Sequence, residues 1–141
     1  LPRGGGALVE LTDMRDAAQA LVLADQRRAA VGGRAFNVSG GTAVSVRDFA
    51  LDLAAATGRS LKLMSAPWPL LYAGAALAEG VAALLPGRPE PPITRYGAAT
   101  LAFSQTFDLT AARRDLGWTP RHDAIAAALE LARRWAEGSR A

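Results

Sequence analysis

Cysteine is absent from the 141-residue chain, and histidine occurs once. Without cysteine the chain can form no disulfide, no thiolate nucleophile and no cysteine-ligated zinc site. A single histidine, His122, also excludes a histidine-rich metal site. We therefore predict that the chain contributes no metal ligands.

The net charge of the chain is also small. The chain has 16 basic and 13 acidic residues, for a formal net charge of +3, and only one of the basic residues, Lys62, is a lysine. Its arginines are scattered, whereas a nucleic-acid-binding surface needs them clustered on one face beside stacking aromatic rings. We expect no nucleic-acid partner. Half of the residues are apolar, which excludes wholesale disorder, and the length suits a single domain over residues 1–141.

The chain starts at Leu1 and shows no secretory pattern of basic start, apolar core and cleavage site. We interpret it as part of a longer protein, with residues 1–6 as a linker. Its glycine clusters, Gly4–Gly6 and Gly40–Gly41, do not follow the Gly-x-Gly-x-x-Gly spacing of a dinucleotide site. We predict a linker and a turn there, and no cofactor-binding residue.

Short apolar runs alternate with helical periodicity, which favours an α/β fold. Strands are predicted at 7–12, 35–38 and 61–64, and an extended segment at 104–107. Helices are predicted at 13–28, 46–57, 93–102 and 108–116 and after Asp123. Ser45 and Asp48 match a capping box at the start of one helix.

Residues 67–92 form an unusual segment: an apolar helix over 70–85 with one charge, Glu79, then a proline-rich loop over 86–92. At 1.5 Å per residue the helix is roughly 24 Å long, which is short for a bilayer core. Two readings stay open. The helix covers a pocket in the core, or it rests on lipid with Trp68 and Tyr72 near the interface.

Paired acids invite a general acid–base role, and Asp13 and Asp16 lie three residues apart before a predicted helix. Capping and helix-dipole stabilisation explain both residues better. Asp108 is placed to cap another helix, and His122 is predicted to be a solvated loop residue. We expect no catalytic residue in the chain.

Three stretches, in order, resemble one family. Residues 11–20 (LTDMRDAAQA) are similar to the V-D-V-R-D-V-A-x-A junction of the extended short-chain dehydrogenases/reductases, the NAD-dependent epimerase/dehydratase group. Residues 33–49 resemble its G-x-x-Y-N-I-x-x-G stretch and the helix start that follows. Residues 104–120 resemble its D-x-S-K-A-x-x-x-L-G-W-x-P element, and a final helix containing Trp135 follows as expected.

Residues 93–97 and 104–108 look most like the 3β-hydroxysteroid dehydrogenase/dihydroflavonol reductase branch. Nucleotide-sugar epimerases usually place an arginine before the first strand to hold the diphosphate. This sequence has Ala7-Leu8-Val9 there, with Arg3 as the nearest arginine. The departure argues against a sugar nucleotide and for a less charged small-molecule substrate, with an apolar one as the example we expect.

The resemblance implies the C-terminal part of a Rossmann-type NAD(P)-binding fold with its small substrate-binding lobe. NAD or NADP would belong to the intact protein. The N-terminal cofactor domain, with the catalytic Tyr-x-x-x-Lys, would lie upstream. Here Tyr72 and Tyr96 are followed four residues later by Ala76 and Thr100 instead of lysine. We therefore expect this chain to be inactive alone.

The predicted substrate-binding residues are Trp68 and Tyr72, as a pocket wall, and Arg95 and Tyr96, as polar contacts at the mouth. Two alternatives remain open: a non-catalytic interaction module that forms a homodimer, and attachment to a membrane surface through residues 68–85. We expect a cytoplasmic location, peripheral to a membrane in the second case.

Overall fold

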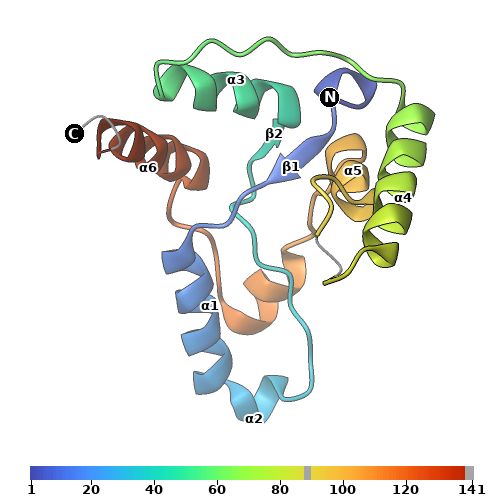
Figure 1. The fold of residues 1–141 in the computed structure, drawn as a ribbon. Helices are drawn as coiled ribbons and strands as arrows, with labels where there is room; N and C mark the ends of the chain where they lie inside the picture. Colours follow the sequence, from blue (N-terminus) through green and yellow to red (C-terminus); the bar gives the residue numbers. More distant parts are fainter. Residues whose placement is uncertain (88–89, 139–141) are drawn as a thin grey trace.

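A computed structural model describes residues 1–87 and 90–138 (Figure 1). Its helices and strands are β1 (Leu8–Glu10), α1 (Met14–Gln26), α2 (Arg28–Val31), β2 (Ala43–Ser45), α3 (Val46–Ala56), α4 (Trp68–Leu84), α5 (Arg95–Ala102) and α6 (Ala124–Gly138). Short turns occupy Arg3–Gly5 and, as a π-helix, Ala112–Leu116. The helices predicted from the sequence are thus all found, although the one over 108–116 is a short π-helical turn.

Local capping explains where two of the helices begin. The Asp13 carboxylate accepts a 2.8 Å hydrogen bond from the Arg15 backbone N–H at the start of α1. The Ser45 hydroxyl accepts a 3.0 Å bond from the Asp48 N–H, and it donates to the Asp48 carboxylate over 2.7 Å. These contacts confirm the predicted capping roles of Asp13 and Ser45.

β1 and β2 form a small antiparallel sheet in which Val9 faces Val44. On its other side β1 meets the segment after α5, where the Gln105 N–H donates a 2.7 Å hydrogen bond to the Leu8 carbonyl. Residues 104–105 therefore extend the sheet by one parallel bridge, next to the start of β1. This places the end of α5 beside the N-terminal segment (Figure 1).

Two of the predicted strands are wrong. Residues 35–38 and 61–64 have no strand pairing in the structure. A strand is stabilised by the neighbour it pairs with. Instead, the side chains of Phe36 and Val38 pack against the buried cluster that includes Ala20 of α1, and polar groups of this segment bond to loops. The Asn37 amide donates to the Asp108 carbonyl over 3.4 Å, and the Val38 carbonyl accepts from Thr12. Near 61–64 the pairing falls at Ala66, which bridges Pro2.

The main buried cluster lies between α1 and the π-helical turn. It contains Ala20, Val31, Leu109, Ala112, Leu116 and Trp118. Trp118 and Leu116 are the largest fully buried side chains of the described residues. This core holds the lower end of the molecule together in Figure 1.

Residues 1–6 are not the linker that the sequence predicts. The Pro2 side chain is fully buried, and the Ala66 N–H donates a 3.0 Å hydrogen bond to the Leu1 carbonyl. Arg3, Gly4 and Gly5 then turn with positive φ angles of 49°, 73° and 78°. The segment is therefore a packed part of the fold that fixes where Arg3 lies.

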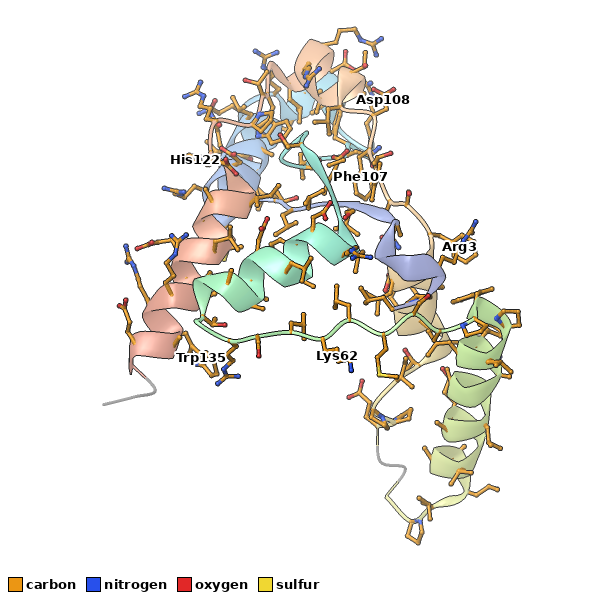
Figure 2. The ribbon with its side chains drawn as sticks, turned by 90° about the horizontal axis from the view of Figure 1, so that it is seen from above. Arg3, Lys62, Phe107, Asp108, His122 and Trp135 are labelled. Atoms are coloured by element: carbon orange, nitrogen blue, oxygen red, sulfur yellow. The ribbon has the colours of Figure 1, made fainter. Side chains whose placement is uncertain are left out.

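α4 and α5 form an arm that extends from the rest of the molecule (Figure 2). α4 agrees with the apolar helix predicted over 70–85 and begins two residues earlier. Of the predicted loop at 86–92, residues 86–87 and 90–92 form neither helix nor strand. Residues 88–89 lie outside the described part of the chain.

Candidate substrate-binding site

Three aromatic rings meet at the N-terminal end of α4. Trp68 lies 5.3 Å from Tyr72 between ring centroids, with the planes tilted by 48°. It lies 5.2 Å from Phe103, which follows α5, in an edge-to-face arrangement at 82°. Trp68 and Tyr72 are four residues apart, so they stand one above the other on the same helix face. The three rings, which we call the aromatic cluster, join α4 to the end of α5.

An ion pair fixes the other end of α5. The Glu79 carboxylate on α4 accepts a 2.7 Å hydrogen bond from the Arg95 backbone N–H and a 2.6 Å bond from its guanidinium Nε. These bonds lower the pKa of Glu79, and the Glu79 carboxylate, with a smaller contribution from the Tyr72 phenol, raises the pKa of Arg95. Arg95 is therefore held against α4 beside the aromatic cluster.

Of the four residues predicted to bind substrate, the structure brings Trp68, Tyr72 and Arg95 together. Tyr96 is the next residue after Arg95, but its side chain is 78% exposed. Within residues 1–87 and 90–138 it makes no ring contact with the cluster. One helical step turns Tyr96 away from the face on which Arg95 meets α4.

Two neighbouring residues were missed by the sequence reasoning. Phe103 completes the cluster, and the guanidinium carbon of Arg3 lies 5.6 Å from the centroid of the Phe103 ring. Figure 2 shows Arg3 on the outer edge of the N-terminal turn, on the side where α4 begins. Neither residue belongs to a local pattern, since Phe103 is far from Trp68 and Arg3 is far from Phe103 along the chain. The arginine near the first strand was the only available signal.

The cluster is suited to binding an apolar group. Aromatic faces bind apolar groups, and guanidinium groups bind anions. Glu79, the carboxylate on α4, already accepts two hydrogen bonds from Arg95. In the described ranges, acidic residues and His122 form no group of three that could hold a metal ion. The arrangement can position a substrate against an apolar wall.

The start of α1 does not fit a cofactor pyrophosphate. A dinucleotide site needs glycines between strand and helix, so that free amides at the helix N-terminus reach the phosphates. Leu11, Thr12 and Asp13 connect β1 to α1 instead. The Asp13 carboxylate accepts the Arg15 N–H and pairs with the Arg15 guanidinium at 2.8 Å, which lowers the pKa of Asp13. The Asp13 carboxylate therefore already occupies an amide that a phosphate would need at this helix start.

Asp16 and His122 form a second polar group, near the start of α6. The Asp16 carboxylate accepts hydrogen bonds of 3.0 Å from the backbone N–H groups of Arg121 and His122, and its other oxygen lies 2.7 Å from His122 Nδ1. His122 is thus half-buried and bound to Asp16, and the prediction of a solvated loop residue is wrong. Asp16 keeps its predicted architectural role, because these contacts join α1 to the segment that leads into α6.

No family model matches this chain. Two curated proteins are similar to it. The uncharacterized protein YbjS of Escherichia coli (strain K12) is 34% identical over 125 residues, which are 85% of this chain and 36% of that protein. The 2-alkyl-3-oxoalkanoate reductase of Stenotrophomonas maltophilia (strain K279a) is 32% identical over 120 residues, which are 83% of this chain and 36% of the reductase. The chain thus spans 36% of the length of each relative, and over most of its own length it is similar to a protein named as a reductase.

Proposed function

We propose that these residues form the substrate-binding part of an NAD(P)-dependent reductase of the extended short-chain dehydrogenase/reductase group. The substrate is a carbonyl compound with a largely apolar body. The cofactor and the catalytic Tyr and Lys belong to residues upstream of this chain. Trp68, Tyr72 and Phe103 pack against the apolar body, and that contact orients the carbonyl group toward the cofactor.

The similarity to the 2-alkyl-3-oxoalkanoate reductase, over 83% of the chain, is the observation that carries this proposal. The aromatic cluster supports it, since its three rings offer a largely apolar wall on which the Tyr72 hydroxyl and the Trp68 indole N–H are the polar groups. The name of that relative makes 3-oxoalkanoates the first substrates to test.

The test compares this chain with the longer protein that includes its upstream residues. Each is mixed with NADH or NADPH and a 2-alkyl-3-oxoalkanoate, and cofactor oxidation is followed by absorbance. We expect turnover from the longer protein and none from residues 1–141 alone. Turnover by this chain unaided, or a longer protein that leaves 3-oxoalkanoates and other apolar ketones unreduced, would contradict the proposal.

The outer face of α4 favours a second candidate function, contact with a membrane surface. Leu70, Leu77 and Leu84 are seven residues apart along the helix and are 70%, 69% and 87% exposed. Spacing of seven places them on one face. Among the helices of residues 1–87 and 90–138, none has both the length and the apolar content to cross a bilayer. In this candidate function the apolar face lies on the lipid surface.

Sedimentation with lipid vesicles tests this second candidate. We expect the chain to sediment with them and Leu77→Glu to weaken binding about tenfold, because a buried charge opposes insertion of an apolar face. Leu21→Glu on α1 is the matched control, since Leu21 is 74% exposed on another helix. Equal losses in both variants, or no binding by the unmodified chain, would exclude this function. A dimer that dissociates in Leu77→Glu would favour self-association instead.

A further inference from the structure

An open cavity of about 470 Å³ lies beside the aromatic cluster, on the side of Phe103 that faces the N-terminal turn. Arg3, Gly6, Ala7, Ala102, Phe103 and Ser104 line it. Its wall is half polar in character: the Phe103 ring and two alanines are apolar, whereas Arg3 and Ser104 carry a guanidinium and a hydroxyl. The Ser104 Oγ accepts a 3.0 Å hydrogen bond from the Leu8 N–H, which leaves its own O–H free to donate.

Arg3 is held at this cavity in a strained backbone conformation. Its φ of 49° makes it the one non-glycine residue of the described ranges with a positive φ. A side chain with a Cβ is rare in this region, especially one that is neither Asn nor Asp, and such outliers gather at binding sites. The neighbouring turn imposes this geometry, because Pro2 is buried and Gly5 packs closely against Arg47.

The Arg3 guanidinium lies over the Phe103 ring, with its carbon 5.6 Å from the ring centroid, and has no carboxylate within ion-pair distance in the described part of the chain. Arg95, at the other side of the cluster, is instead paired with Glu79. The ring face attracts the cation, and the N–H groups of a planar guanidinium match the two oxygens of a carboxylate. Arg3 is therefore a cation beside the cluster that a ligand can reach and that has no carboxylate partner among the described residues.

We propose that Arg3 and Ser104 bind the carboxylate of an amphiphilic acid whose apolar body lies along Phe103 and Trp68. The ligand class is an alkanoate or oxoalkanoate. The cavity supplies one cation, one hydroxyl and an aromatic surface, which fit a single anionic head on an apolar chain. The statement that the bound acid is the substrate rests on the proposed function. The binding of the acid can be measured without cofactor and without turnover.

Direct titration of the chain tests the proposal. The probes are octanoate and its neutral counterpart octanamide, below micelle-forming concentrations, with Phe103 and Trp68 ring signals followed by nuclear magnetic resonance. We expect octanoate to bind at least about tenfold more tightly than octanamide, since hydrogen bonds to a charged group exceed neutral ones by that amount. Octanoate should shift the rings of both residues.

Arg3→Gly is the decisive variant, because glycine accepts a φ of 49° without strain and the fold should survive. We expect it to lose about tenfold or more in octanoate affinity and little in octanamide affinity. Lys62→Ala, which removes one exposed positive charge outside this cavity, is the control and should leave both affinities unchanged. Equal binding of the two probes, or equal effects of the two variants, would overturn the proposal.

Competition separates this site from a phosphate site. Inorganic phosphate and NADP should displace octanoate only at much higher concentrations than decanoate does. If phosphate displaced bound octanoate at a concentration similar to that of octanoate itself, the assignment of the site to a carboxylate would be overturned. In the longer protein, turnover of 3-oxoalkanoates with an unchanged KM in Arg3→Gly would refute this inference and leave the proposed function intact. If octanoate bound through Arg3 but the longer protein had no reductase activity, the proposed function would be refuted and this inference would stand.

Discussion

The indole Nε1 of Trp118 donates a 2.9 Å hydrogen bond to the backbone carbonyl of Asp16, a residue 102 positions earlier. Both side chains are buried, Trp118 completely and Asp16 to all but 1% of its surface. The contact satisfies the only polar atom of the indole and a helix carbonyl together. It fastens α1 to the segment that leads into α6 and so closes the lower core.

Trp118→Phe should lower the free energy of unfolding by about 2 kcal/mol, from the lost hydrogen bond and the space left by the smaller ring. Urea denaturation followed by circular dichroism measures the change. Tyr96→Phe, at an exposed ring, should change it by less than about 0.5 kcal/mol. A Trp118→Phe protein as stable as the parent would show that this contact does not hold α1 in place.

The Asp16 carboxylate predicts how stability depends on pH. Burial opposes its ionisation, but the hydrogen bonds from the His122 ring and from the His122 and Arg121 backbone outweigh burial and lower the pKa of Asp16. A lowered folded-state pKa stabilises the fold fully above the unfolded value of about 3.9, and the contribution is lost as the pH falls through the folded pKa.

Asp16→Asn should therefore be less stable than the parent by about 2–4 kcal/mol near neutral pH, because an amide cannot accept all three hydrogen bonds. The difference should shrink as the pH is lowered below about 4. Urea denaturation at several pH values from about 7 to about 3 measures the stability difference and its change with pH. A difference that stays constant over that range would mean that the Asp16 charge does not stabilise the fold.

Local signals in the sequence predicted where helices start, but they did not predict which distant segments contact each other. Asp13 and Ser45 could be identified as caps because each acts on an amide two or three residues away. The strand predicted at 35–38 has the right composition, but a strand requires a partner, and periodicity does not reveal one. β2 was missed because only three residues pair with β1.

The candidate site divides in the same way. Trp68 and Tyr72 share a helix face at a spacing of four, so the sequence could group them. Phe103 joins them only because α5 folds back against α4, and Arg3 joins Phe103 only because Pro2 is anchored at Ala66. Tyr96 has a side chain suited to a polar substrate contact, but its position on α5 directs it to solvent.

The Glu79–Arg95 pair predicts a local effect rather than a global one. Both side chains are partly exposed, and pairs of this kind add little to overall stability. Arg95→Ala should nevertheless speed amide hydrogen exchange in the first turn of α5 about fivefold, because that turn is held to α4 through Glu79. The unfolding temperature should move by no more than about 2 °C.

Glu79→Gln is the matched variant, since glutamine keeps an acceptor for the Arg95 N–H and removes the charge. Its effect on exchange should be smaller than that of Arg95→Ala, and the double variant should add little to the larger effect. Additive effects, or faster exchange spread over α1 and α6, would show that the two residues do not act as a pair between α4 and α5.

Neighbouring glycines in the N-terminal turn should respond differently to alanine. Both have positive φ, so each substitution carries the conformational penalty of that region, about 1 kcal/mol. At Gly4 a new Cβ meets nothing within 4 Å, whereas at Gly5 it would lie 2.6 Å from Leu1 Cδ1 and 3.0 Å from Arg47 Cβ. Gly5→Ala should therefore destabilise the chain by about 3 kcal/mol, and Gly4→Ala by about 1 kcal/mol.

Urea denaturation measures both losses of stability, and equal values would mean that the turn does not pack against the first turn of α3 as the structure has it. Because that packing also holds Arg3 at its cavity, Gly5→Ala should weaken octanoate binding more than Gly4→Ala does.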